Sequence, residues 1–122
     1  MRQKCLDTYA LVEIAKGNPA FFEYLSDEVI LTDVTLAEFY AVLLREDGKQ
    51  TAEYWFHKLS FYSIPVDKET LKRAVAFRYE HRKEKISFFD AVGYVFSQER
   101  GFLFVTGDKS FEKMKGVEYK KA

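Results

Sequence analysis

The sequence lacks several features that would narrow its function at once. It has one cysteine, Cys5, so no disulfide can form within the chain, which fits a reducing cytoplasm and a buried, unreactive thiol. Lys and Arg number 19, as do Asp and Glu, and this zero net charge neither indicates nor excludes a nucleic-acid partner. No apolar run approaches the length of a membrane span and no secretory signal is readable, so we expect no membrane association.

Histidine is also scarce. His57 and His81 are the only two, and both lie within predicted helices beside charged residues. Surface positions of this kind are more typical of helix solubility than of catalysis. The chain therefore gives no sign of a histidine-dependent reaction, such as the chemistry of ribonucleases that use the RNA 2′-hydroxyl as nucleophile.

What the sequence does contain is an alternation of short apolar runs and amphipathic segments. With 48% hydrophobic and 31% charged residues, the 122 residues are typical of one globular domain spanning 1–122. We expect strands over 2–6, 29–31, 62–66, 102–105 and 117–120, and helices over 9–16, 20–25, 36–47, 49–59, 68–82, 88–100 and 110–114. This order predicts an α/β fold, a three-layer α/β/α sandwich with a mainly parallel central sheet.

Four carboxylates stand near the starts of predicted helices: Asp7, Glu38, Asp90 and Asp108. In an open α/β sheet, ligands bind outside the carboxyl ends of the strands, and acidic side chains at that edge would converge although they are distant in sequence. Converging carboxylates repel each other unless a cation neutralises them, and hard divalent cations prefer oxygen ligands. The pattern therefore indicates a Mg²⁺ or Mn²⁺ site, and with it phosphate chemistry.

Helix capping is the competing explanation. Thr35 with Glu38, and Ser87 with Asp90, fit a capping box, while Asp7 and Asp108 fit plain N-caps. For each residue alone the two explanations are about equal. A cap returns only about 1 kcal/mol. Two carboxylates about 5 Å apart repel by roughly 3 kcal/mol at an effective dielectric of 20, so capping would not account for four that converge.

The order and spacing of these residues, over the whole chain, resemble PIN domains, the ribonuclease domain of VapC-type toxins. The matching segments are Leu6, Asp7 and Thr8; the run 35–39; the run 87–91; and the run 106–111. One departure is mild, since Phe88 and Phe89 stand where a polar or small residue is frequent.

The resemblance implies metal-dependent hydrolysis of single-stranded RNA. Asp7, Asp90 and Asp108 would hold one or two Mg²⁺ or Mn²⁺ ions, and Glu38 would position the attacking water or act as its base. Thr106 would support a carboxylate or a water. The same resemblance implies a homodimer and a VapB-type antitoxin that covers the site.

Several residues near these carboxylates are candidates for RNA contact. They are Thr8, Arg82, Lys83, Lys85 and Lys109. The basic segment 78–85 is equally explained as a solvated helix end, because cations favour helix C-termini. Aromatic residues near 55–62 belong either to the core or to a partner surface.

Three other functions are alternatives for an α/β chain of this length. A phosphoacceptor receiver domain needs adjacent acidic residues after its first strand, and a haloacid-dehalogenase-like phosphatase needs Asp-x-Asp there, whereas Asp7 is followed by Thr8 and Tyr9. The serious alternative is a non-catalytic PIN-like module that binds protein or RNA.

Overall fold

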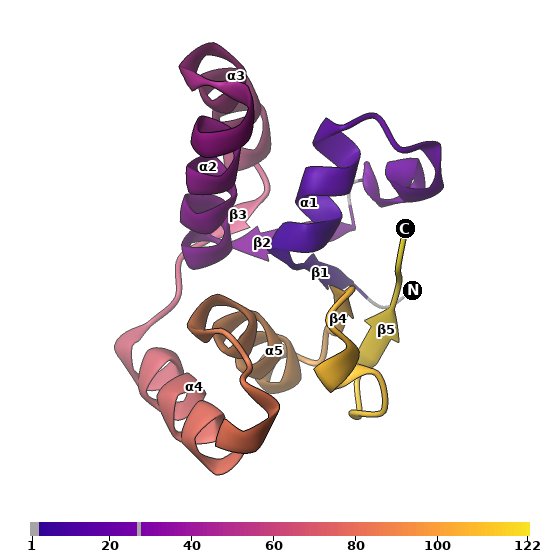
Figure 1. Cartoon of the computed structure of the whole chain (residues 1–122). Helices are drawn as coiled ribbons and strands as arrows, with labels where there is room; N and C mark the ends of the chain where they lie inside the picture. Colours follow the sequence, from indigo (N-terminus) through magenta and orange to yellow (C-terminus); the bar gives the residue numbers. More distant parts are fainter. Residues whose placement is uncertain (1–2, 27) are drawn as a thin grey trace.

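The computed structural model describes residues 3–26 and 28–122, so Arg2, which begins the predicted first strand, lies outside the described residues. The strands are β1 (Lys4–Leu6), β2 (Val29–Thr32), β3 (Ser63–Ile64), β4 (Leu103–Thr106) and β5 (Val117–Tyr119). The α-helices are α1 (Thr8–Ala15), α2 (Asp33–Asp47), α3 (Lys49–Ser60), α4 (Lys68–Glu80) and α5 (Phe88–Arg100). Three short 3₁₀ helices are η1 (Pro19–Tyr24), η2 (Arg82–Glu84) and η3 (Lys109–Phe111). Figure 1 shows their arrangement.

The five strands form one sheet in the order β3-β2-β1-β4-β5, and every neighbouring pair is parallel. The central strand β1 pairs with β2 on one side and β4 on the other. The two-residue strand β3 lies at an edge, and Pro65 directly follows it, as its missing N–H predicts. The predicted parallel sheet is confirmed.

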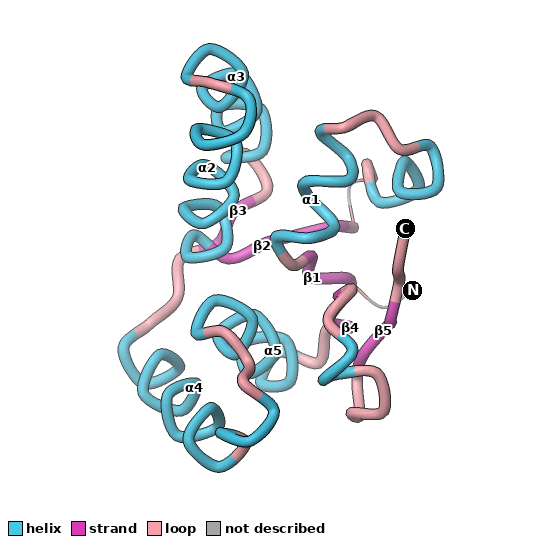
Figure 2. Tube along the Cα trace, in the orientation of Figure 1, coloured by secondary structure: helices cyan, strands magenta, loops and turns pink. Residues whose placement is uncertain are grey.

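Side chains alternate between the two faces of the sheet, and helices cover both faces (Figure 2). Leu6, Leu31 and Val105 pack into a cluster with side chains of α1, α2 and α3. Cys5 and Ile30 point the other way and pack with Phe96 of α5. The predicted α/β/α sandwich is therefore confirmed. Cys5 is fully buried, and burial raises the pKa of its thiol to about 12, as expected for an inert core residue.

Helix α5 approaches β4 closely because position 93 has no side chain. A Cβ atom on Gly93 would lie 2.7 Å from a ring carbon of Phe104, closer than atoms pack. The glycine thus lets the helix rest directly on the sheet. The predicted span 88–100 for this helix, begun by Ser87 and ended by Gly101, matches α5.

Three predicted helices differ from the structure. The helix predicted over 110–114 is the three-residue 3₁₀ helix η3. The segment predicted as a helix over 20–25 is the 3₁₀ helix η1, in which Phe21 and Tyr24 are buried while Phe22 and Leu25 are exposed. Helix α2 begins at Asp33 rather than at 36, because the side chain of Thr32 at the end of β2 accepts a hydrogen bond from the Thr35 N–H.

Helix α4 turns a different face to the core than its pattern indicated. Leu71, Val75 and Tyr79 have helical spacing, which predicts one apolar stripe, but Val75 and Tyr79 are exposed. Thr70 and Ala74 are buried instead, because α4 packs along α5 through that side. Val75 and Tyr79 instead line a surface pocket. No helix in the described part of the chain is both long enough and apolar enough to cross a membrane.

Candidate active site

The four predicted carboxylates come from elements that meet at one edge of the sheet. Strands β2, β1 and β4 are adjacent and parallel, so their carboxyl ends share that edge. Asp7 follows β1 directly, Asp108 follows β4 after one glycine, and Glu38 lies in the second turn of α2, which continues from β2. Asp90 lies in the first turn of α5, which leads the chain back to the amino end of β4 and so begins at the same edge.

Asp7 is the most deeply buried of the four, with 2% of its surface exposed. Its carboxylate accepts hydrogen bonds from the N–H groups of Ala10 (2.8 Å) and Gly107 (3.4 Å). Burial raises the pKa of the Asp7 carboxyl, the hydrogen bonds from Ala10, Thr106 and Gly107 lower it in part, and the charge of Glu38 raises it; the net pKa is about 6. The side chain is thus an N-cap of α1, held in one orientation.

Asp90 shows that the four carboxylates lie within electrostatic reach of one another. Burial, and after it the charges of Asp7, Glu38 and Asp108, raise the pKa of the Asp90 carboxyl to about 8. Its own N–H donates to the Ser87 hydroxyl at 3.1 Å, the capping bond that the sequence predicted. Capping explains the position of Asp90, but it leaves the crowding of negative charge unexplained.

Glu38 has no capping role, which corrects the prediction made from Thr35. The N-cap of α2 is Thr32, so Glu38 is a full turn too late to satisfy the helix end. Its carboxylate instead accepts a short hydrogen bond from the hydroxyl of Thr8, thirty residues away in the chain. Thr8, a candidate for RNA contact, therefore orients Glu38 in this structure.

Thr106 connects the carboxylates Asp7 and Asp108. It is fully buried, and its hydroxyl oxygen accepts the Asp108 N–H at 3.0 Å. A hydrogen bond from Thr106 also lowers the pKa of Asp7. The Asp108 carboxylate accepts the Ser110 N–H at 2.9 Å and caps the short helix η3. One threonine thus helps to hold Asp7 and Asp108.

The donor set suits a hard divalent cation, because all four groups offer carboxylate oxygens and crowd negative charge that a cation would neutralise. Asp7, Asp90 and Asp108 could hold such an ion. In the described ranges, 3–26 and 28–122, no three His, Cys, Asp or Glu side chains are yet arranged to do so. The carboxylates therefore suit a divalent cation by their donor atoms and their charge, and not by a preformed coordination geometry in the described residues.

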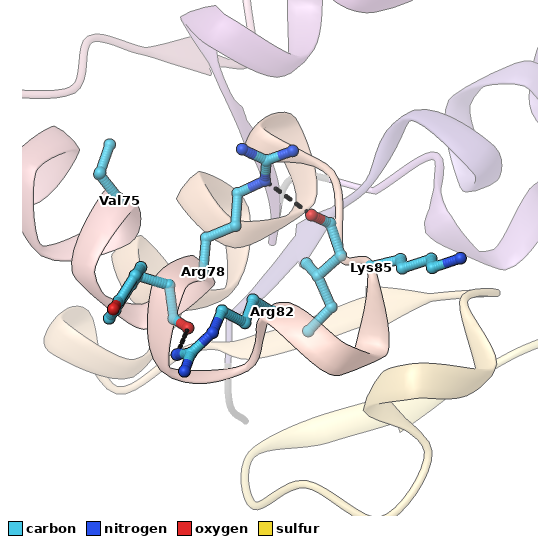
Figure 3. Close-up of a pocket in the computed structure, with 6 residues that line it drawn as sticks. Val75, Arg78, Arg82 and Lys85 are labelled. Carbon is cyan, nitrogen blue, oxygen red and sulfur yellow. Dashed lines mark hydrogen bonds between the residues drawn. The ribbon is translucent and has the colours of Figure 1, made fainter.

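The predicted basic candidates are neighbours of the carboxylates in the sequence, since 82–85 precedes α5 and Lys109 follows Asp108. Arg82, Lys83, Lys85 and Lys109 are all exposed. The Ser110 hydroxyl donates to the Glu84 carbonyl at 3.3 Å, which ties the turn after Asp108 to η2. Arg82 and Lys85 line a pocket at this junction, shown in Figure 3.

Sequence reasoning missed the residues that border the site beyond β4. The ammonium of Lys121 donates to the Gly107 carbonyl at 3.4 Å and lies 5.4 Å from the ring centroid of Tyr9. A Cβ atom on Gly107 would lie 2.5 Å from that ring, so glycine permits the approach. The predicted last strand was the available signal, since pairing it parallel to β4 would carry the following residues to this edge.

Comparisons with known proteins agree with the fold. The profile of the PIN domain family matches residues 4–117. No curated protein sequence matches the chain.

Several solved structures similar to the chain are of toxins or toxin–antitoxin complexes. The structure of Mycobacterium tuberculosis VapC20, described as a sarcin-ricin loop cleaving toxin, has a TM-score of 0.80 and 18% identity and covers 98% of this chain and 100% of that one. A toxin–antitoxin complex from Klebsiella pneumoniae has a TM-score of 0.74 and 20% identity, covering 95% and 96%. DNA-bound VapBC from Salmonella typhimurium has a TM-score of 0.76 and 17% identity, covering 98% of each chain.

These matches confirm the predicted resemblance at the level of family and fold. The match to the family profile extends over nearly the whole sequence, and the three structures above each cover at least 95% of this chain. The chain belongs to the PIN domain family and has the fold of VapC toxins.

Proposed function

We propose that this protein is a metal-dependent endoribonuclease that cleaves single-stranded RNA by attack of water on the phosphodiester, and that it is the toxin of a toxin–antitoxin pair. The observation that carries the proposal is that Asp7, Glu38, Asp90 and Asp108 come from elements that meet at the carboxyl edge of β2, β1 and β4; burial and the charges of the other three carboxylates together raise the pKa of Asp90. Four carboxylates at one edge of a PIN fold suit a divalent cation and a phosphate substrate better than any structural role.

In this proposal Asp7, Asp90 and Asp108 hold one or two Mg²⁺ or Mn²⁺ ions. A divalent cation there supplies a lowered water pKa and neutralises charge that develops on the phosphate. The hydrogen bonds from Ala10 and Gly107 fix the Asp7 oxygens in advance. Preorganisation of this kind limits the rearrangement needed when the ion and the substrate bind.

Glu38 is the proposed general base. It is half-buried and accepts the Thr8 hydroxyl, which leaves its second carboxylate oxygen able to take a proton from water. Thr106 positions Asp7 and Asp108 relative to one another without touching substrate. Water is the nucleophile, so the products carry 5′-phosphates.

The partners proposed for the whole chain follow its relatives. VapC20 is described as cleaving the sarcin-ricin loop, and the Klebsiella and Salmonella structures are complexes that contain an antitoxin. By analogy, residues 1–122 act as one cytoplasmic domain, form a homodimer and bind a VapB-type antitoxin.

The test is cleavage of a mixed-sequence single-stranded RNA with Mn²⁺, with Mg²⁺ or with EDTA. Wild type should give metal-dependent products with 5′-phosphates, and Asp7→Asn should give none. Asp67→Asn is the matched control, because Asp67 is also a helix N-cap but lies on α4, away from the carboxylates. Cleavage that survives EDTA or Asp7→Asn would refute the proposal. RNA binding without cleavage under any metal would favour the non-catalytic module.

A further inference from the structure

A basic pocket opens where the end of α4 meets η2 and the segment that leads into α5 (Figure 3). Its volume is about 330 Å³. It is lined by Val75, Arg78, Tyr79, Arg82, Lys85 and Ile86. Three of these six side chains are cationic and none is acidic, although the chain as a whole has no net charge. The pocket therefore concentrates positive charge where an anion can enter.

Both arginines are held in place by backbone carbonyls. The Arg78 Nε–H donates to the Ile86 carbonyl at 2.8 Å, and Arg82 donates to the Tyr79 carbonyl at 2.9 Å, the two dashed bonds in Figure 3. A guanidinium has five N–H groups, so each arginine keeps donors for a ligand. The carbonyl bonds reduce the conformational entropy lost when a ligand binds.

The pocket also presents an aromatic platform. Tyr79 is 66% exposed, and the Arg82 guanidinium lies 4.4 Å from the centroid of its ring. Val75, one turn earlier on α4, is 55% exposed. Cations beside an exposed aromatic ring are the combination that binds single-stranded nucleic acids, in which bases stack and phosphates pair.

Lys85 stands out within the pocket. Its φ of +55° lies in the left-handed region, which is unfavourable for a residue other than glycine. In the described part of the chain its ammonium makes no hydrogen bond or ion pair, and Figure 3 shows the side chain extending away from Val75. The strained turn thus presents a free cation.

This cation is close to the carboxylates. Lys85 precedes the α5 N-cap, Ser87, by two residues, and Asp90 lies in the first turn of that helix. Chain dimensions place the Lys85 and Asp90 Cα atoms at most roughly 12 Å apart. The bond from Ser110 to the Glu84 carbonyl brings the turn after Asp108 to the same place.

We propose that the basic pocket binds the phosphate backbone of single-stranded RNA beside the bond that the carboxylates cut. Arg82 and Lys85 each pair with one phosphate, and Tyr79 stacks on a base. This inference rests on the proposed ribonuclease function and adds a binding surface for the RNA substrate. An acidic peptide would use the cations but has no use for the exposed ring, which favours RNA.

The experiment measures binding rather than cleavage. Fluorescence anisotropy of a short labelled single-stranded RNA is recorded in EDTA over a salt series, for wild type and for Arg82→Gln/Lys85→Gln. Arg45→Gln/Lys49→Gln is the matched control, since it also removes one exposed Arg and one exposed Lys, at the far end of α2 and the start of α3. Thermal melting verifies that all three proteins are folded.

The pocket variant should bind RNA about 25-fold more weakly at 0.1 M salt, and its log–log salt slope should fall by about 1.4, because each phosphate contact on a single strand contributes about 0.7 to the slope. The control should bind as wild type does. Tyr79→Leu should weaken binding without changing the slope, because stacking releases no counterions.

Several outcomes would overturn the inference. If both double variants bind RNA as wild type does, the pocket is not the RNA-binding surface, while the ribonuclease proposal stands. If wild type neither binds nor cleaves RNA, both proposals fail. Displacement of the RNA by a poly-glutamate peptide at equal charge would assign the pocket to an acidic protein. Conversion of a wild-type dimer to a monomer by Arg82→Gln/Lys85→Gln would assign it to an interface between two copies.

Discussion

Replacing Asp90 by asparagine should stabilise the metal-free protein. Because crowding and burial hold the pKa of Asp90 at about 8 rather than near 4, the folded state keeps a proton that the unfolded state releases at neutral pH. At pH 7 this linkage costs at most about 4 kcal/mol. Asp90 is part-exposed, so we expect Asp90→Asn to raise the free energy of unfolding by about 1–3 kcal/mol in EDTA.

The dependence on pH gives a sharper test of the same idea. When a carboxyl has a higher pKa in the folded state than in the unfolded state, the free energy of unfolding of the protein falls as pH rises from the unfolded pKa to the folded pKa. Asp7 contributes to this fall only up to its folded-state pKa of about 6. We therefore assign the fall in wild-type stability between pH 6 and 8 to Asp90. That decline approaches about 1.4 kcal/mol per pH unit for one proton, and Asp90→Asn should remove it.

Divalent metal should reverse the comparison. A ligand that binds only the folded state stabilises it by about 2.7 kcal/mol at a hundred times its Kd. Mn²⁺ or Mg²⁺ should therefore raise the stability of wild type and have little effect on Asp90→Asn. The two proteins should exchange order when metal replaces EDTA.

The assay is urea unfolding, followed by circular dichroism at several pH values, with EDTA and with Mn²⁺. Asp67→Asn is the control, because Asp67 caps α4 through a 2.9 Å bond from the Thr70 N–H and asparagine caps as well as aspartate does. The control should keep the wild-type decline between pH 6 and 8. If Asp90→Asn is less stable than wild type in EDTA, or keeps that decline, the reasoning about clustered charge is wrong.

Three further substitutions test single contacts. Thr106→Val leaves a buried N–H without its acceptor and should lower the free energy of unfolding by about 1–3 kcal/mol, with RNA cleavage reduced as well. Thr8→Val releases the Glu38 carboxylate and should slow cleavage by about 10- to 100-fold while melting stays near that of wild type; unchanged cleavage would remove Thr8 from the site. Gly93→Ala places a methyl group 2.7 Å from the ring beneath α5 and should cost about 1–3 kcal/mol in urea unfolding, and a neutral result would mean that α5 can shift away from the sheet.

The parts of the fold that local signals determine could be predicted from the sequence. Ser87 and Gly101 bound α5 through a cap and a left-handed residue, and both act within a few residues. The continuous apolar run before Thr106 is typical of a buried parallel strand, as β4 is. Asp7, Asp90 and Asp108 follow local signals of this kind, whereas the capping signal before Glu38 is misplaced because α2 begins at Asp33.

Features that depend on distant packing could not be predicted. Two stripes of α4 have helical spacing, and only the position of α5 determines that Ala74 is buried and Val75 exposed. The Thr8–Glu38 bond joins residues thirty positions apart in the chain. Their pairing follows from the strand order of the sheet.

The central claim is that Asp7, Asp90 and Asp108 form one divalent-metal site and that Glu38 acts as the base in the hydrolysis it serves. The most direct measurement is Mn²⁺ binding by electron paramagnetic resonance, for wild type, for the four single Asn or Gln variants and for Asp67→Asn. Wild type and the control should bind Mn²⁺ equally, Asp7→Asn, Asp90→Asn and Asp108→Asn should bind it more weakly, and Glu38→Gln should bind Mn²⁺ but fail to cleave RNA. Mn²⁺ binding that survives in all three aspartate variants, or is absent in wild type, would contradict the claim.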